Sequence, residues 1–144
     1  MKIAIYLPGV FETKTDGYEH VDLSEIGSLD DAAYEEIFVD SCLDFIEQRD
    51  DFIKELVKKI RYAGQIIISG SDVYEISRAM MSKNLSLEET NSILYNGRYS
   101  ISSVLDVVTR LQQLGLNILH KRVNDFKYTI IGAGIIGLAA VVII

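Results

Sequence analysis

The chain has 144 residues, of which 49% are hydrophobic and 24% are charged, and its formal net charge is −7. This length and composition allow one globular domain with a real hydrophobic core. A single proline and 10 glycines exclude a collagen-like or low-complexity chain. Cys42 is the only cysteine, which excludes a disulfide scaffold. The negative charge argues against a nucleic-acid-binding surface spread over the whole protein.

The charges are divided unevenly along the chain. Residues 12–55 carry fifteen acidic and three basic side chains, a net charge of −12, whereas residues 56–144 carry six acidic and ten basic ones, a net charge of +4. The ordinary interpretation of the acidic part is a solvated face. The functional alternative is a site for a cationic or hydroxyl-rich ligand, because clustered carboxylates raise the local concentration of cations.

Three short strands are predicted in the first third of the chain. Lys2–Leu7 is an apolar run that the turn signal Pro8-Gly9 closes. Tyr18–Leu23 follows a second turn signal, and Glu35–Val39 is the third candidate.

The period of the hydrophobic residues then changes to that of a helix. Gln48–Arg61 has apolar residues at helical spacing, with acidic residues early and basic residues late, as the helix dipole favours. Gln65–Ser69 is a nearly continuous apolar run, which is typical of a strand buried on both faces of a parallel sheet.

Three further helices and a hairpin complete the pattern. The helices are expected at Val73–Met81, Leu87–Tyr95 and Ser102–Leu114, and the first two begin with capping-box spacing. Asn117–Arg122 and Phe126–Ile131 read as a closing antiparallel pair. Alternating strands and helices with a terminal hairpin predict a compact, three-layer α/β domain with a mostly parallel sheet.

In such folds ligands bind beyond the carboxyl ends of the strands. The segments that follow the predicted strands are therefore the candidates for a site. They are Leu7–Val10, Asp22–Glu25, Asp40–Asp44 and Ser69–Asp72. Three of these four segments begin or end with a carboxylate.

Residues 29–72 resemble the central block of class I S-adenosylmethionine-dependent methyltransferases. Glu36-Ile37 stands where that family has an Asp-x-Ile core, and Leu43–Ile46 stands for its Leu-Glu-His segment. Arg61–Gly64 matches the helix end and glycine turn, and Gly70–Asp72 lies near its Pro-Asp strand end. The resemblance, which covers about residues 2–131, implies a Rossmann-like methyltransferase fold for residues 1–131.

The same resemblance implies where the cofactor S-adenosylmethionine would bind. Leu7 and Gly9 stand in place of the glycine-rich cofactor loop after the first strand. Asp22 matches the acid at the end of the second strand, which holds the ribose hydroxyls because a carboxylate accepts two protons at once. Asp30 or Asp31 stands where the family contacts the adenine amino group.

Asp40 and Asp44 lie where family members often place groups that contact the substrate, and they are the catalytic candidates. The ordinary alternative for both is an acid near a helix N-terminus. Two function classes follow. The first is a methyltransferase that acts on a small-molecule or sugar-like acceptor. The second is a non-catalytic binding or assembly module that has the same fold and has lost the cofactor.

The last segment, residues 132–144, differs in composition from the rest of the chain. It contains no charged or polar side chain and is shorter than a membrane span of about 20 residues. It reads as a buried terminal element, a tail foreign to the domain, or an exposed apolar segment that drives association into a homo-oligomer. The run Gly132-Ala133-Gly134-Ile135-Ile136-Gly137 has dinucleotide-binding spacing without the helix and acid that this chemistry needs.

The sequence predicts no metal site and a cytoplasmic location. His20, His120 and Cys42 lack the spacing of metal ligands. No secretory signal opens the chain, and a lone thiol fits a reducing compartment.

Overall fold

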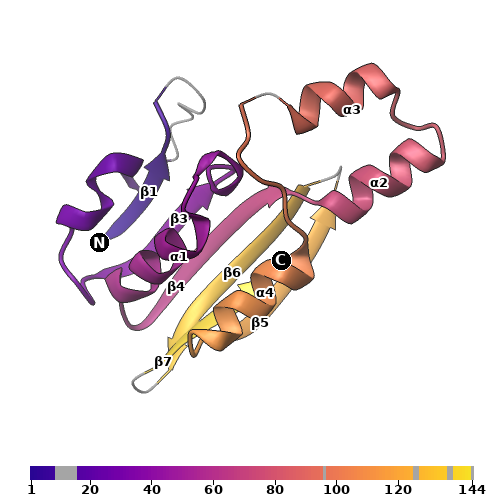
Figure 1. Cartoon of the computed structure of the whole chain (residues 1–144). Helices are drawn as coiled ribbons and strands as arrows, with labels where there is room; N and C mark the ends of the chain where they lie inside the picture. Colours follow the sequence, from indigo (N-terminus) through magenta and orange to yellow (C-terminus); the bar gives the residue numbers. More distant parts are fainter. Residues whose placement is uncertain (9–15, 96, 125–126, 136–137, 144) are drawn as a thin grey trace.

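A computed structural model describes residues 1–8, 16–95, 97–124, 127–135 and 138–143. Its centre is a seven-stranded sheet in the order β2-β1-β3-β4-β6-β5-β7 (Figure 1). The strands are β1 (Lys2–Tyr6), β2 (Glu19–Asp22), β3 (Tyr34–Asp40), β4 (Ile60–Ser71), β5 (Asn117–Asn124), β6 (Lys127–Ile135) and β7 (Leu138–Ile143).

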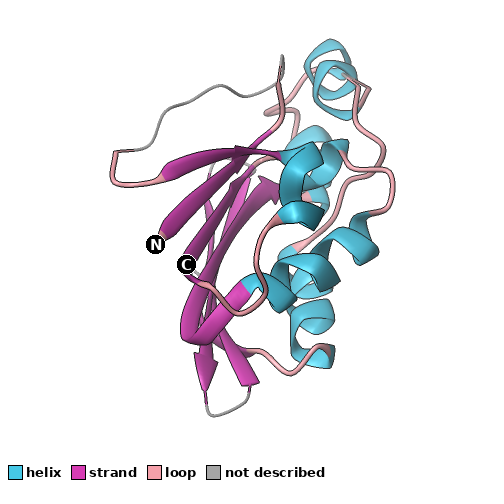
Figure 2. Cartoon of the chain, turned by 90° about the vertical axis from the view of Figure 1, so that its left-hand side faces the viewer, coloured by secondary structure: helices cyan, strands magenta, loops and turns pink. Residues whose placement is uncertain are grey.

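The helices of the described residues gather on one side of this sheet (Figure 2). They are the short 3₁₀ helices η1 (Leu23–Ser28) and η2 (Leu43–Phe45) and the α-helices α1 (Arg49–Lys59), α2 (Val73–Met81), α3 (Leu87–Leu94) and α4 (Val104–Gln113). We call the opposite side of the sheet, where the described part of the chain has no helix, the helix-free face.

The sheet has a parallel half and an antiparallel half. Strands β2, β1, β3 and β4 are parallel, and β6 is antiparallel to both β4 and β5. A tight turn can join β5 to β6 only in the antiparallel sense, whereas the parallel strands need longer connections. The expected α/β Rossmann-like fold, with an antiparallel C-terminal hairpin, is confirmed.

The main core lies between the sheet and helices α1 and α4. Alternate side chains of the strands are buried on this side, as in Ile37 and Val39 of β3 and Ile66 and Ile68 of β4. The helices contribute apolar stripes: Phe52, Ile53 and Leu56 from α1, and Val107, Val108 and Leu111 from α4. Leu105, which the helical spacing placed on the apolar face of α4, is exposed.

Helices α2 and α3 lie to one side of this core, beyond the carboxyl end of β4 (Figure 1). They have a small apolar cluster of their own around Ile76, Ala79 and Leu85. Asp72 connects the two parts, because its Oδ2 accepts from the Glu75 amide at the start of α2, 3.0 Å away, and its Oδ1 accepts from the Val104 amide at the start of α4, also 3.0 Å away.

Two boundaries differ from the sequence-based expectation. The chain passes from α1 directly into β4 at Ile60. Near the start of this strand Ala63 adopts a left-handed conformation, and the pairing with β3 shifts register between Tyr34 and Glu36. Strand β6 continues to Ile135, so the expected domain boundary at residue 131 falls inside a strand. The glycine-rich run of the tail lies in β6 and β7, apart from residues 136–137, which are outside the described residues.

Candidate functional site

The carboxyl ends of the parallel strands bring Asp22 and Asp40 to one level of the sheet. Asp22 pairs with Tyr6 of β1. Tyr6 and Asp40 each come one residue after the pair formed by Ile5 and Val39. Directly paired residues of neighbouring strands point to the same face. Asp22, Tyr6 and Asp40 therefore lie on the helix-free face, opposite the buried Ile5 and Val39.

The same level continues across the other half of the sheet. Asp40 pairs with Ser69 of β4, Ser69 pairs with Thr129 of β6, and Thr129 pairs with Arg122 of β5. We call these four residues the polar row. It carries a carboxylate at one end, two hydroxyls in the middle and a guanidinium at the other end. Since strands are about 4.8 Å apart, the row is roughly 14 Å long.

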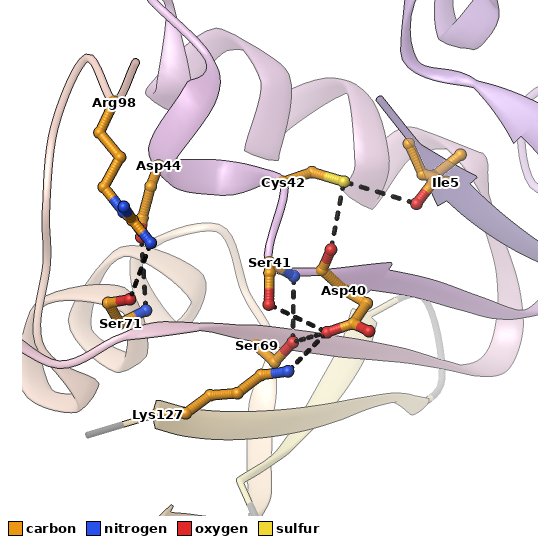
Figure 3. Close-up of polar contacts among 9 residues, drawn as sticks. All are labelled: Ile5, Asp40, Ser41, Cys42, Asp44, Ser69, Ser71, Arg98 and Lys127. Carbon is orange, nitrogen blue, oxygen red and sulfur yellow. Dashed lines mark hydrogen bonds and ion pairs between the residues drawn. The ribbon is translucent and has the colours of Figure 1, made fainter. Parts of the chain in front are cut away.

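Asp40 is held by three donors that converge on one carboxylate oxygen (Figure 3). Its Oδ1 accepts hydrogen bonds from Ser69 Oγ at 2.7 Å, Lys127 Nζ at 2.8 Å and Ser41 Oγ at 3.0 Å. No hydrogen bond within the described part of the chain uses its Oδ2. Burial opposes ionisation of Asp40, but Lys127 and Ser69 outweigh it and hold the pKa below its usual value. Asp40 is therefore a fixed anion with one open oxygen.

The chain turns sharply after Asp40 and buries the next side chain. Ser41 has a φ of +57°, in the left-handed region, and its amide donates to the Ser69 carbonyl at 3.1 Å. Cys42 then points inward, and its thiol contacts the carbonyls of Ile5 and Asp40 (Figure 3). Burial, with the nearby charge of Asp40, raises the pKa of this thiol to about 12, so it is not a nucleophile at neutral pH.

Asp44 has a different environment from Asp40. It is only 1% exposed, and burial raises its pKa despite hydrogen bonds from the Ser71 amide and from Arg98. Its Oδ2 lies 3.3 Å from Arg98 Nε, and its Oδ1 is buried with no hydrogen-bond partner in the described part of the chain. The two predicted catalytic acids thus differ in burial, and Asp44 has no direct access to solvent.

Arg98 explains why Asp44 is covered. Its guanidinium also donates to the Ile93 carbonyl and to Ser71 Oγ, and it lies over the Phe45 ring with 5.0 Å to the ring centroid. The backbone amides of Tyr99 and Ser100 donate to the Asp44 carbonyl. These contacts hold residues 97–100, which we call the Arg98 segment, against η2.

The predicted cofactor residues have separate positions. Asp22 begins η1, and its Oδ1 accepts from both the amide and the hydroxyl of Ser24 at 3.0 Å. Leu7 packs against the main core, and Gly9 lies outside the described residues. Asp30 is exposed. Asp31 forms an ion pair with Lys59 at 2.7 Å, and this partner lowers its pKa.

A cavity of about 190 Å³ lies on the helix side of the sheet, between α1 and α4. Two ion pairs cross it: Arg49 with Asp106 at 3.0 Å and Arg110 with Asp50 at 2.8 Å. The polar row lies on the other side of the sheet. This cavity is therefore separate from the carboxyl-end site.

The described residues contain no group of three His, Cys, Asp or Glu side chains that could hold a metal ion. Within the same residues, no helix has the length and apolar character needed to cross a membrane.

Sequence reasoning identified Asp40 but not its partners. Ser69 lies in the predicted segment Ser69–Asp72, but nothing in the sequence indicated that its hydroxyl would contact Asp40. Lys127 and Arg122 come from the hairpin, 87 and 82 residues after Asp40 in the sequence. No local pattern relates residues so far apart, because only the pairing of β4 with β6 brings them together.

Comparison with solved structures relates this arrangement to known proteins, whereas no family model and no curated protein matches the chain. An O-methyltransferase family protein from Burkholderia thailandensis superposes with a TM-score of 0.59 and 15% identity, over 83% of this chain and 36% of that one. A SAM-dependent methyltransferase from Thermotoga maritima superposes with a TM-score of 0.55 and 12% identity, over 81% of this chain and 64% of that one.

A SAM-dependent methyltransferase from Archaeoglobus fulgidus gives a TM-score of 0.54 and 10% identity, over 81% of this chain and 68% of that one. The chain thus spans from about a third to two thirds of the length of these structures. At such identities the likeness concerns the fold alone. The chain has a class I methyltransferase-like fold.

Proposed function

We propose that the chain binds S-adenosylmethionine at the carboxyl ends of β1 and β2 and transfers its methyl group to a small-molecule or sugar-like acceptor in a cytoplasmic setting. The observation that carries this proposal is the placement of Asp22 and Asp40 at one level of a methyltransferase-like sheet. Parallel α/β sheets bind ligands at this edge.

The residues at the end of β2 fit the cofactor's ribose. Ser24 donates two hydrogen bonds to Asp22 Oδ1, and within the described residues Asp22 Oδ2 has no hydrogen-bond partner. That oxygen can accept from a hydroxyl while the first keeps η1 in place. Asp30 has no ion-pair partner in the described part of the chain, whereas Asp31 is engaged by Lys59. Asp22 and Asp30 are thus the carboxylates that would hold the nucleoside.

The cofactor, when bound, would supply a methyl carbon activated by a positively charged sulfur, and the sulfur would leave as a neutral thioether when the methyl group passes to an oxygen or nitrogen of the acceptor. The chain's contribution is to position the acceptor. Asp40 can accept a hydrogen bond from the acceptor through Oδ2, since three donors hold its Oδ1. Asp44 acts indirectly in this scheme, by holding the turn after Asp40 against the Arg98 segment.

Calorimetric titration with S-adenosylhomocysteine and S-adenosylmethionine tests the proposal. We expect micromolar affinity for the wild type and its loss in Asp22→Ala. Ser24→Ala is the matched control, because it removes a partner of the same Oδ1 and leaves the carboxylate in place. A thermal unfolding curve for each variant shows whether it is folded.

Absence of binding at millimolar cofactor would overturn the proposal and favour the non-catalytic module. Equal binding by wild type and Asp22→Ala would leave a cofactor site and remove Asp22 from it. Association through residues 132–144 stays a prediction, which sedimentation of the whole chain tests.

A further inference from the structure

The cavity between α1 and α4 is lined by four charged side chains from the two helices. Arg49 and Asp50 come from the first turn of α1, and Asp106 and Arg110 come from α4. The two positive and two negative charges cancel. The volume of about 190 Å³ is below the range of about 300–1,000 Å³ that is typical of pockets for drug-sized ligands, and it equals the space of about six water molecules. The cavity therefore suits a small molecule.

The charged groups of this cavity differ in depth. The side chains of Arg49 and Arg110 are 22% and 30% exposed, whereas those of Asp106 and Asp50 are 57% and 56% exposed. The two guanidinium groups therefore lie deeper than the two carboxylates. A ligand in the cavity meets positive charge toward the sheet and negative charge toward solvent.

Both guanidinium groups have a buried donor without an acceptor. Arg49 contacts Asp106 through Nη2, and its Nη1 is buried with no hydrogen-bond partner in the described part of the chain. Arg110 contacts Asp50 through Nη2, and within the same residues its buried Nε also has no partner. A buried donor without an acceptor is costly. The two arginines can therefore use an acceptor beyond the single carboxylate that each one contacts.

The two ion pairs can exchange partners with a ligand. Each aspartate uses only its Oδ2, and no hydrogen bond or ion pair of the described residues uses Oδ1 of Asp50 or Asp106. Because more than half of each aspartate side chain is exposed, solvent screens both pairs and their separation costs little. A carboxylate that enters the cavity can replace an aspartate at a guanidinium group and form the two-point contact that arginine favours.

The displaced aspartate decides which molecule fits. A simple anion would leave this aspartate beside it without a positive partner, and a simple cation would leave the arginine without a negative one. A molecule with both a carboxylate and an ammonium group keeps the charges alternating, from guanidinium to carboxylate to ammonium to aspartate. Ile53 and Val107, each 1% exposed, provide the apolar part of the lining for a short side chain.

We propose that the cavity between α1 and α4 binds a small amino acid in its zwitterionic form. Its carboxylate contacts Arg49 and Arg110, and its ammonium group contacts Asp50 and Asp106. This binding does not rest on the proposed transfer reaction, since the cavity and the carboxyl-end site lie on opposite sides of the sheet.

L-Alanine is the probe, because its size suits the cavity and its two charged groups can be removed one at a time. Propionate lacks the ammonium group, and ethylamine lacks the carboxylate. In an NMR titration of the ¹⁵N-labelled chain without cofactor, we expect L-alanine to bind at least about tenfold more tightly than either compound, which corresponds to 1.4 kcal/mol. The amide signals of Ile53 and Val107 should shift.

Two variants separate the ends of the ligand. Arg110→Gln should weaken the binding of both L-alanine and propionate at least about fivefold, because it removes a guanidinium group. Asp106→Asn should weaken L-alanine by a similar factor and leave propionate within about twofold of the wild type. Arg78→Gln is the matched control and should change neither affinity, since Arg78 pairs with Glu75 at 3.0 Å on α2 and does not line the cavity. Thermal unfolding curves show whether each variant is folded.

Three results would overturn the site. Propionate that binds as tightly as L-alanine would show that the ammonium group makes no contact. An equal loss of affinity in Arg110→Gln and Arg78→Gln would indicate non-specific charge attraction. Unchanged signals of Ile53 and Val107 at millimolar L-alanine would show that the cavity does not bind it.

S-Adenosylmethionine also carries an amino-acid group, so the two sites need separate tests. We expect Asp22→Ala to bind L-alanine as the wild type does, and Arg110→Gln to bind S-adenosylhomocysteine as the wild type does. If L-alanine binds and S-adenosylhomocysteine does not, the transferase proposal fails and the amino-acid site stands. If Arg110→Gln loses both ligands, the cavity is part of the cofactor site and the separate amino-acid site is wrong.

Discussion

Asp40 ends β3 and Asp44 lies four residues later, in η2, and their environments are opposite. Asp40 is partly exposed and receives a hydroxyl from β4 and an ammonium from β6. Asp44 is buried beneath the Arg98 segment and receives the Ser71 amide and the Arg98 guanidinium. The positive φ of Ser41 separates them, because it turns the chain from the helix-free face into the core. Two acids that look equivalent in the sequence therefore have different environments, one partly exposed and one buried.

Removing the partner of the buried acid should give the largest effect. Arg98→Ala leaves Asp44 buried without its counter-charge, and we expect a loss of about 3–5 kcal/mol in the free energy of unfolding. Urea denaturation measures it. Arg78→Ala is the control, because Arg78 pairs with Glu75 while 74% of its side chain is exposed, and it should cost at most about 0.5 kcal/mol. Equal losses would show that Asp44 is not a buried, partner-dependent acid.

Gly70 lies between the two environments, since Ser69 contacts Asp40 and Ser71 contacts Asp44. A Cβ at Gly70 would lie 2.7 Å from the hydroxyl of the fully buried Tyr128. We expect Gly70→Ala to cost about 1–3 kcal/mol, because the ring has no room to move. Gly27→Ala has nothing within 4 Å of its Cβ and should change stability by less than about 0.5 kcal/mol. Similar stability of both variants would contradict the tight packing of Tyr128.

The two acids should also give pH dependences of opposite sign. The pKa of Asp40 is lowered on folding, so its stabilisation is present above the unfolded value of 3.8 and is lost as the pH falls through the folded pKa. The pKa of Asp44 is raised, so its contribution is greatest below 3.8 and is lost as the pH rises through the folded pKa.

Unfolding free energies of Asp40→Asn and Asp44→Asn, measured from about pH 2 to pH 7, separate these contributions. Asp40→Asn should flatten the loss of stability at the acidic end. Asp44→Asn should flatten the decline of the unfolding free energy just above pH 3.8. Curves of the same shape for both variants would mean that the two carboxyls share one environment.

The smallest effect is expected at the exposed ion pair. Lys127→Met removes a partner 2.8 Å from Asp40, but 46% of the lysine side chain and 35% of the aspartate side chain are exposed. Solvent screens such a pair, and we expect a loss of about 0–1 kcal/mol that shrinks as salt is added. A loss as large as that of Arg98→Ala would show that Lys127 is essential to the fold and that solvent does not screen this pair.

The sequence by itself determined most of the helices and strands and two acids of the candidate site. Apolar residues at helical spacing predicted α1 and α4, the capping boxes predicted the starts of α2 and α3, and β-type runs predicted β1 to β6, because these signals are local. The position of Asp40 and Asp44 after a strand was also readable, since ligands gather at that edge of parallel sheets.

Only the tertiary structure decided which groups surround those acids. The pairing of β6 with β4 and β5 places Arg122 on the level of Asp40 and brings the Lys127 ammonium within 2.8 Å of Asp40. The Arg98 segment covers Asp44 from a loop 54 residues further along the chain. Hydrogen-bond register and burial are long-range outcomes of packing. Residue identity alone could therefore not distinguish the open carboxylate from the buried one.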